Sequence, residues 1–322
     1  MKVSLLLFAS LTLCLFYTMN FFSKKSIAVF LMLFLTANLV CQTDISRDSN
    51  SKTKISKKKK KSKKKVKLPN VDLSHWKVTI PEGKGKGGAI SVRPPEILEY
   101  ANNEVLRPFM YNDSAVGAIV FHAYPTNATT ANTKYSRSEL REQMEPGNDN
   151  VNWTFAQGGI LKAKMAMGEV TRADNGKYHK VIIAQIHGRL TNEQKELIGQ
   201  KDNNAPPILK IYWQNGKIRV KTKVLKFAGV DNKGILFKEA WTDDKGRNFE
   251  EEVGFRKFTI EVKVTDGKMV VSLNKNEFFV YDSPSIKRWG VFENYFKVGN
   301  YFQTRDEGAF ASVKLFDLSV EH

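Results

Sequence analysis

Apolar and polar residues alternate along most of the chain beyond residue 70, which is the period of an extended strand with one buried face. The alternation is clearest over residues 159–170 and 181–187. Residues 208–224 and 258–280 each indicate a hairpin, because an Asn-Gly or an Asp-Gly pair interrupts a run rich in β-branched residues. The pattern therefore predicts many short antiparallel strands.

Helix-like composition is confined to residues 190–200, where Thr191 and Gln194 have the spacing of a capping box. We therefore expect an all-β chain with one or two short helices. About 250 residues of short strands without an internal repeat are typical of one two-sheet sandwich or barrel. A domain of this size buries roughly 70–75% of its unfolded surface, so its core is sufficient to hold it together.

Three segments in this β-rich region place their polar residues on one parity, so each would present a polar stripe on one face of a strand. Arginine, lysine, amide, imidazole and phenol groups on one sheet face suit a long, anionic, hydroxyl-rich ligand better than a hydrophobic core. The stripes therefore point to an acidic polysaccharide. They comprise Arg137, Glu139 and Arg141; Gln185 and His187; and Tyr295, Lys297, Tyr301 and Gln303.

The same segments resemble the three signature strands of polysaccharide lyase family 7, the alginate lyases. They are Ser-Arg-Ser-Glu-Leu-Arg-Glu (136–142), Gln-Ile-His (185–187) and Tyr-Phe-Lys-Val-Gly-Asn-Tyr (295–301), in the family's order. Residues 72–81 resemble the family's opening strand, so the similarity extends from about residue 70 to the C-terminus. The resemblance implies a β-jelly roll, a two-sheet antiparallel sandwich with a concave substrate groove.

Breaking alginate by β-elimination requires removal of the proton at C5 and expulsion of the sugar linked through O4. Donors must hold the neighbouring carboxylate while enolate-like charge develops, and a base and an acid must lie within hydrogen-bond reach. The resemblance assigns Arg137 and Gln185 to the carboxylate, and His187 both to the carboxylate and as a base on guluronate. It makes Tyr301 the acid, and also the base on mannuronate. A phenol needs cationic neighbours to act as a base, and Arg137 and His187 are the candidates.

The other stripe residues are expected to bind substrate or to support the catalytic groups. Glu139 lies two residues from Arg137 on the same face and is expected to orient an arginine. Arg141 and Lys297 lie four positions from Arg137 and Tyr301, roughly 13 Å along a strand, and are expected to grip neighbouring sugars. Tyr295 and Gln303 could line the same groove, although a purely structural role is equally open for both.

Two details of the motifs bear on specificity. Gln-Ile-His is similar to the subgroup that accepts guluronate-containing blocks. Asn300 and Phe302 depart from the common family pattern, which has a small apolar residue and Asn there, so packing near Tyr301 is expected to differ. The other histidines do not lie in such polar motifs, so we interpret them as structural or solvent-exposed: His75, His122, His179 and His322.

Three other functions compete with a lyase. A glycoside hydrolase would need two carboxylates about 5–9.5 Å apart, but the stripes are basic and amidic. A non-catalytic binding module for acidic polysaccharides would share the fold and groove, but it would not need Tyr301 and His187 together. Nucleic-acid binding would rest on the net charge of +18, yet residues 1–70 hold 15 Lys and Arg against 2 Asp and Glu. The remainder, 36 against 31, is only about +5, so we expect no nucleic-acid partner.

The first 70 residues predict a targeting region and a linker. Residues 1–41 have the apolar runs of a secretory signal, with residues 1–18 interpreted as an upstream extension, although a hairpin of two membrane segments is the alternative. Cys41 follows the second run, so lipid anchoring at the cell surface and free secretion are both open. Residues 42–69 are Lys-rich with almost nothing to bury, which predicts a disordered linker that contributes to association with anionic surfaces but not to chemistry.

Residues 70–322 would then be one lyase domain, which we expect to act as a monomer on alginate without a metal or other cofactor. Both cysteines, Cys14 and Cys41, precede this domain, so it can form neither an internal disulfide nor a cysteine metal site.

Overall fold

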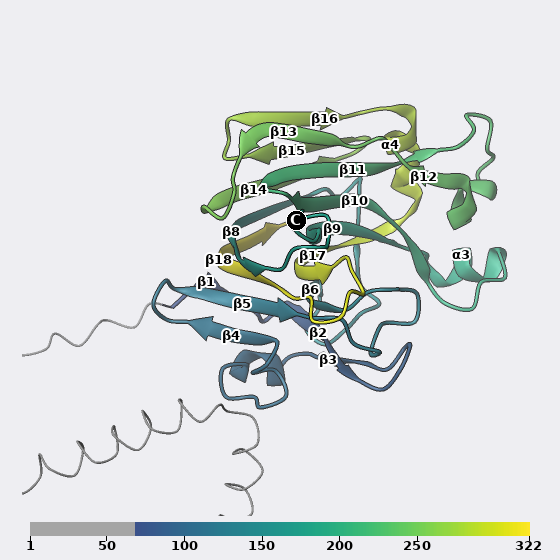
Figure 1. The fold of residues 1–322 in the computed structure, drawn as a ribbon. Helices are drawn as coiled ribbons and strands as arrows, with labels where there is room; N and C mark the ends of the chain where they lie inside the picture. Colours follow the sequence, from purple (N-terminus) through teal and green to yellow (C-terminus); the bar gives the residue numbers. More distant parts are fainter. Residues whose placement is uncertain (1–67) are drawn as a thin grey trace, which may run out of the picture. The chain divides into compact units, whose positions relative to one another are not determined.

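Strands account for about half of residues 68–322, the part of the chain that the computed structural model describes. In β14 (Phe258–Thr265), for example, every second side chain is buried. The strands form two almost entirely antiparallel sheets whose apolar faces share one core (Figure 1). This arrangement confirms the expected all-β jelly roll. The expectations for residues 1–67, including the signal region, Cys41 and most of the linker, lie outside the described residues.

The smaller sheet contains eight strands. Strand β1 joins it by parallel pairing with β18, and β18 lies between β8 and β5. The order across the sheet is β16 (Glu277–Tyr281), β15 (Lys268–Leu273), β14 (Phe258–Thr265), β8 (Gly159–Val170), β18 (Ala311–Glu321), β5 (Ala118–Ala123) and β4 (Met110–Asp113), with β1 (Asn70–Val71) beside β18.

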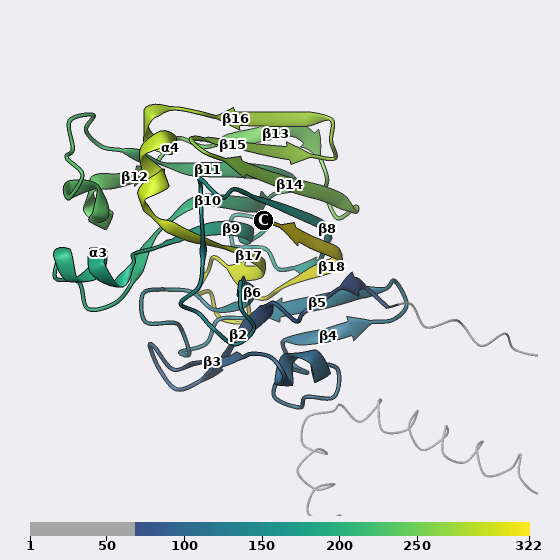
Figure 2. The ribbon, with the colours of Figure 1, turned by 180° about the vertical axis from the view of Figure 1, so that it is seen from behind.

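The larger sheet contains ten strands, and Figure 2 shows the molecule from the opposite side. Its centre is formed by strands from distant parts of the sequence. The order is β12 (Trp241–Asp243), β11 (Lys217–Leu225), β10 (Asn204–Gln214), β9 (Val181–Arg189), β17 (Glu293–Phe302), β6 (Arg137–Glu142), β2 (Trp76–Gly83) and β3 (Ala89–Val92), with β13 (Arg247–Glu252) on β11 and β7 (Trp153–Thr154) on β17.

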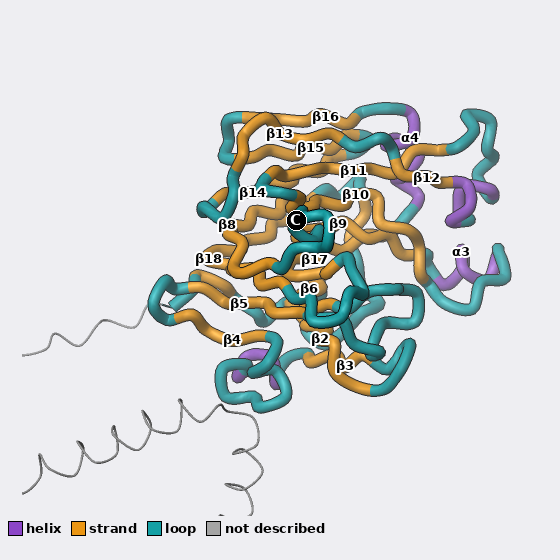
Figure 3. Tube along the Cα trace, viewed as in Figure 1, coloured by secondary structure: helices purple, strands orange, loops and turns teal. Residues whose placement is uncertain are grey.

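The described helices are short and lie at the periphery of the sandwich (Figure 3). The predicted capping box is confirmed, because Thr191 and Gln194 exchange hydrogen bonds at the start of α3. Among residues 68–322, no helix combines the length and the apolar character needed to cross a membrane. The helices are α3 (Asn192–Leu197), α4 (Pro284–Arg288) and the 3₁₀ turns η2 (Glu96–Glu99), η3 (Gly234–Leu236), η4 (Lys238–Ala240) and η5 (Trp289–Val291).

Both predicted hairpins are confirmed. Strands β10 and β11 are joined by Asn215 and Gly216, which have φ values of 50° and 84°. Strands β14 and β15 are joined through Gly267, at φ 67°. These positive φ values explain why Asn-Gly and Asp-Gly pairs mark the turns.

The three polar stripes lie on neighbouring strands, because β17 is hydrogen-bonded to β9 on one side and to β6 on the other. Gly299 allows the close approach of β17 to β6. Its φ is 140°, and a Cβ at this position would lie 2.8 Å from the Ser138 carbonyl oxygen. Against β9, the register of β17 shifts by one residue between Val298 and Tyr301. The centre of this sheet is therefore bulged close to Tyr301.

The two sheets are tied together at the same place by a buried amide. Asn300 of β17 donates hydrogen bonds from Nδ2 to the carbonyl oxygens of Phe121 in β5, at 3.1 Å, and Ala311 in β18, at 2.7 Å. The next alternate residue, Phe302, is also fully buried and packs edge-on against His179. These contacts give the two positions that depart from the family pattern a packing role on the inner face of β17.

His322 anchors the end of β18 to the larger sheet. Its Nε2 lies 2.7 Å from Glu142 Oε1, and its ring packs against Trp153 and Phe296. Burial alone would lower the pKa of His322, but the Glu142 carboxylate outweighs burial and raises it. His322 is therefore structural, in agreement with its interpretation from sequence.

We expect His322→Ala to lower the free energy of unfolding by roughly 1–3 kcal/mol at pH 6, because a hydrogen bond to a charged group is lost. A raised folded pKa means that this stabilisation is fully present below the unfolded pKa and is lost as the pH rises through the folded pKa. Denaturant melts of both proteins at pH 5.5 and pH 9 test this. An equal difference in stability at the two pH values would contradict a contribution from the charged imidazole.

Candidate active site

The polar faces of β6, β9 and β17 form the floor of a cleft of about 360 Å³. The four residues expected to be catalytic all line this cleft, although they come from three strands that are far apart in sequence. It is bordered by the loop of residues 132–135 before β6 and by residues 204–207, the first residues of β10. The expected residues in its lining are Arg137, Gln185, His187, Tyr301 and Gln303.

Glu139 lies fully buried beneath the cleft and is the hub that joins the residues of its floor. Its carboxylate accepts hydrogen bonds from Arg137 Nη1 at 2.9 Å, Gln185 Nε2 at 2.5 Å and Lys297 Nζ at 2.5 Å. Strand pairing explains the convergence, since Lys297 lies opposite Gln185 on β9 while Glu139 lies opposite Gly299. One residue from each of three strands thus reaches the same two oxygens.

The hub carries a net positive charge, because one carboxylate faces two cations, Arg137 and Lys297. Burial would raise the pKa of Glu139, but the two cations outweigh burial and lower it, so the carboxylate is charged at neutral pH. Burial and the neighbouring Arg137 guanidinium lower the pKa of Lys297 to about 8. The net charge of +1 is suited to one further carboxylate from a ligand.

Arg137 keeps hydrogen-bonding capacity for such a ligand. Its guanidinium lies 3.8 Å from the centre of the Tyr301 ring and uses Nη1 for Glu139. Its Nε is buried and has no hydrogen-bond partner among residues 68–322. Gln185 has given one amide hydrogen to Glu139 and retains a second, because an amide nitrogen carries two.

His187 is held as a neutral imidazole, and one of its nitrogens has no hydrogen-bond partner among the described residues. Its Nδ1 lies 3.0 Å from the Gly188 carbonyl oxygen, which can only accept, so Nδ1 carries the proton. Its ring stacks on Tyr295 with the centres 5.3 Å apart. Burial first, and then the positive charge of Lys297, lower the pKa of His187 to about 3. Nε2 is therefore an unprotonated acceptor throughout the neutral range.

Tyr301 is a protonated phenol in the same cleft. Burial raises its pKa, and the nearby Arg137 guanidinium only partly opposes this effect. The expectation that His187 would help to ionise Tyr301 is wrong in this geometry, because the imidazole is uncharged. The free protein thus holds Tyr301 ready to donate a proton, and His187 ready to accept one.

The position expected for Lys297 needs correction. It was expected to stand roughly 13 Å from the reacting position and to grip a neighbouring sugar. Instead its buried ammonium bonds to Glu139, which also bonds Arg137. The contact joins two different strands, because Glu139 lies on β6 and Lys297 on the paired strand β17. Spacing along one strand could therefore not reveal it.

Arg141 is held in place by several contacts within the protein. Its guanidinium donates to the Glu142 and Asp149 carbonyl oxygens and to Asn152 Oδ1, and it lies over the Tyr295 ring at 4.1 Å. These contacts hold Arg141 against Tyr295 and residues 149–152, and Arg141 also lines a neighbouring cleft of about 260 Å³. Its expected contact with a neighbouring sugar stays a prediction.

Tyr295 and Gln303 flank the catalytic group on opposite sides. Tyr295 lies between His187 and Arg141 and lines a neighbouring cleft of about 260 Å³. Gln303 follows the end of β17, donates from Nε2 to the Tyr301 carbonyl oxygen at 3.2 Å, and lines the main cleft. Both side chains therefore line the groove region, as the sequence left open.

Lys210 and Tyr212 of β10 are among the cleft residues that sequence reasoning missed. Lys210 is paired with Asp243 at 2.5 Å, and burial raises the pKa of Tyr212. Their shared parity on a predicted strand was a usable signal, but the pairing of β10 with β9 was unknown. The loop before β6 also contacts the connection that precedes β10, since Asn132 Nδ2 donates to Asp202 Oδ2 at 3.0 Å.

The chemistry of the lining bears on the competing functions. No carboxylate is among the residues that line the main cleft within the described chain, which counts against the two-carboxylate mechanism of a glycoside hydrolase. Within residues 68–322, no group of three or more His, Cys, Asp or Glu side chains is placed to hold a metal ion. The cleft instead gathers donors, a neutral imidazole and a phenol.

Comparison with known proteins places this site in a family. A family model described as "Alginate lyase" matches residues 71–322. An alginate lyase of Klebsiella pneumoniae is 28% identical over 140 residues, which cover 36% of this chain and 44% of that protein. The chain therefore matches less than half the length of this curated relative.

Solved structures give fuller coverage. Family 7 alginate lyase A1-II′ in complex with substrate (GGMG) is 28% identical, with a TM-score of 0.60 over 79% of this chain and 94% of that one. The same lyase with product (GGG) is 29% identical, with a TM-score of 0.62 over 79% and 97% of the chains. Alginate lyase PA1167 from Pseudomonas aeruginosa, at 21% identity and a TM-score of 0.57 over 78% and 100%, supports the fold alone.

Proposed function

Because the chain belongs to polysaccharide lyase family 7, the alginate lyases, we propose that it cleaves the 1,4-glycosidic bond of alginate by β-elimination. The products would be oligosaccharides with 4-deoxy unsaturated non-reducing ends. One observation carries the proposal: a neutral His187 and a protonated Tyr301 share a cleft with a net-positive hub that offers free donors.

The first step is recognition and proton removal. The uronate carboxylate binds to Arg137 and to the free amide hydrogen of Gln185, which stabilise the enolate-like charge as it develops. Glu139 and Lys297 position these donors. His187 Nε2 takes the C5 proton, and the electron pair of the C5–H bond moves toward the carboxylate.

The second step is expulsion of the leaving group. The C4–O4 bond breaks as the C4–C5 double bond forms, and the Tyr301 hydroxyl donates its proton to O4. This division of labour follows from the protonation states of the free protein, in which Tyr301 holds a proton and His187 Nε2 does not. No cofactor takes part in this scheme.

The separate base and acid favour guluronate-containing blocks as substrate. A base distinct from Tyr301 is needed if the C5 hydrogen and O4 lie on different sides of the ring, and His187 supplies it. Mannuronate would require Tyr301 itself to lose its proton first, which its raised pKa opposes. The Gln-Ile-His sequence at residues 185–187 agrees with this preference.

An absorbance assay tests the proposed function. Residues 70–322 are incubated with polymannuronate, polyguluronate and mixed alginate, and the new C4–C5 double bond is followed in the ultraviolet. We expect a signal with alginate, fastest on guluronate-containing polymer and unchanged by a chelator. A protein that binds alginate without producing the double bond would instead be a binding module, and activity lost to a chelator and restored by one metal would contradict cofactor-free cleavage.

The lowered pKa of Lys297 predicts an alkaline limit to activity. As the pH rises through about 8, Lys297 loses its proton, the hub loses its net positive charge, and kcat/KM for alginate should fall. Lys297→Arg keeps a cation that does not deprotonate in this range, so the limb should move to higher pH. If Lys297→Arg has the same melting temperature as the parent and its kcat/KM still falls at the same pH, the titrating group is not Lys297.

The N-terminal region and the assembly state remain proposals from sequence. We propose secretion, with Cys41 as the lipid attachment point if the protein is anchored at the cell surface, and a monomeric lyase domain. Incorporation of a labelled fatty acid that Cys41→Ser abolishes would establish anchoring. Protein in the medium that carries no labelled fatty acid would establish free secretion. Light scattering of the lyase domain would test whether it is a monomer.

A further inference from the structure

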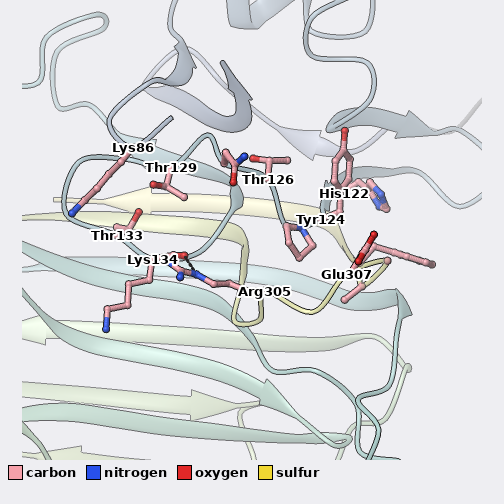
Figure 4. A pocket seen from close by; sticks show the side chains of 14 residues that line it. Lys86, His122, Tyr124, Thr126, Thr129, Thr133, Lys134, Arg305 and Glu307 are labelled. Atoms are coloured by element: carbon pink, nitrogen blue, oxygen red, sulfur yellow. Dashed lines mark hydrogen bonds between the residues drawn. The ribbon is translucent and has the colours of Figure 1, made fainter. Parts of the chain in front are cut away.

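A second and larger cavity, of about 1100 Å³, lies beside the active-site cleft. It is open to solvent and is bordered by the loop between β5 and β6, by the loop between β17 and β18, and by Lys86, which follows β2 (Figure 4). Its volume slightly exceeds the range of about 300–1,000 Å³ that is usual for small-molecule sites, so it has room for more than one sugar ring. None of the residues expected to be catalytic lines it.

Three cations from three different segments line this cavity. Lys86, Lys134 and Arg305 form no ion pair with any carboxylate of residues 68–322, and the single acidic residue of the lining is Glu307. Arg305 donates from Nε to the Lys134 carbonyl oxygen at 3.0 Å, which leaves the outer nitrogens of its fork available. The lining therefore has a surplus of positive charge.

Aromatic rings and hydroxyl groups complete the lining. In Figure 4, His122 and Tyr124 lie at one end, Lys86, Thr129 and Thr133 lie at the other, and Arg305 is between them. The His122 and Tyr124 ring centres are 6.0 Å apart. Burial lowers the pKa of His122, so this ring adds no charge. Amphipathic rings beside hydroxyls and cations suit a polar ring that carries a carboxylate.

The cavity adjoins the end of the cleft at which Tyr301 lies. Thr133 and Lys134 line both spaces. The next residue, Tyr135, places its ring centre 6.4 Å from that of Tyr301. A polymer that leaves the reacting position past Tyr301 therefore meets Thr133 and Lys134 first, and then the cavity.

We propose that this cavity is a second polyuronate-binding site, which holds the part of an alginate chain that extends beyond the cleft on the Tyr301 side. The proposal rests on the proposed function and adds a site to it. Arg305 would grip a uronate carboxylate with its fork, Lys86 would supply a second positive charge, and the ring of Tyr124 would pack against a sugar. The consequence is a preference for long chains over short ones.

Binding to an inactive protein tests the proposal independently of turnover. In a Tyr301→Phe background, Lys86→Glu with Arg305→Glu should weaken the affinity for long polyguluronate by about three- to ten-fold, the effect of losing two partly exposed ion pairs. Affinity for an unsaturated disaccharide, which occupies the cleft alone, should be unchanged. Calorimetric titration gives both values.

Two controls separate the cavity from general charge. Lys263→Glu with Lys268→Glu makes the same change in net charge at two exposed lysines of β14 and β15, and it should leave both affinities unchanged. Arg305→Lys keeps the charge but lacks the planar fork, so its affinity for long polyguluronate should lie between those of the parent and Arg305→Glu. A loss as large as that of Arg305→Glu would contradict a contribution from charge.

The outcomes distinguish this site from the proposed function. If Tyr301→Phe protein binds polyguluronate and reversal of Lys86 and Arg305 has no effect beyond that of the control pair, the second site is wrong and the lyase proposal stands. Equal competition by dextran sulfate would show a general anion patch and would also overturn it. If the Tyr301→Phe protein does not bind polyguluronate at all, both proposals fail.

Discussion

Tyr301→Phe should lower kcat on alginate by at least about 10²-fold, the usual scale of general acid catalysis, with little change in KM. The substitution removes only the hydroxyl that gives its proton to the leaving O4. The ring remains, so its contact with the Arg137 guanidinium at 3.8 Å is retained and the carboxylate-binding donors keep their positions. Steady-state absorbance kinetics on polyguluronate give both constants.

Tyr111→Phe is the matched control, because it removes the same atom from a partly exposed tyrosine of β4 in the other sheet. It should leave kcat and KM unchanged. If Tyr301→Phe retains most of the parent turnover, Tyr301 does not carry the proton to the leaving group, and the assignment based on the family resemblance fails at this position.

Glu139→Gln should damage both stability and activity. The substitution keeps the shape of the side chain but leaves Arg137 and Lys297 buried without their carboxylate. Removing one partner of a buried ion pair costs about 3–5 kcal/mol. Because the folded pKa of Glu139 is lowered, its stabilisation is present above the unfolded pKa of about 4.3 and fades as the pH falls through the folded value. The difference in unfolding free energy should therefore narrow in acid.

A double variant separates the two effects of Glu139. Glu139→Gln with Lys297→Met removes one charge of each sign, so it should recover part of the stability lost in the single variant. It should not recover activity, because Arg137 and Gln185 still lack the carboxylate that positions them. A stable and fully active double variant would show that the hub contributes only to folding.

Local patterns in the sequence predicted the strands, both hairpins and the cap at Thr191, because each depends on residues a few positions apart. The central part of the site also followed from parity, since Gln185 and His187 do face one cleft. Pairing between distant strands is not encoded locally. The contact of Lys297 with Glu139 and the place of Lys210 in the cleft both depend on which strands become neighbours.

Charge states were equally hard to predict from sequence. His187 stood as a candidate cation beside Tyr301, yet burial and the adjacent Lys297 lower its pKa and leave it neutral. That result reverses its electrostatic role: it cannot help to ionise the phenol, but it is free to take a proton. The assignment of base and acid therefore depends on burial, which emerges only when the three strands are assembled.

The pH dependence of kcat/KM on polyguluronate tests this central assignment most directly, because it reports the ionisation of the free enzyme. With the pKa of His187 near 3, kcat/KM should be flat from about pH 5 to pH 7. An acid limb at about pH 6.5, the ordinary value for histidine, would mean that His187 is charged in the free protein and would contradict its role as a preformed neutral base.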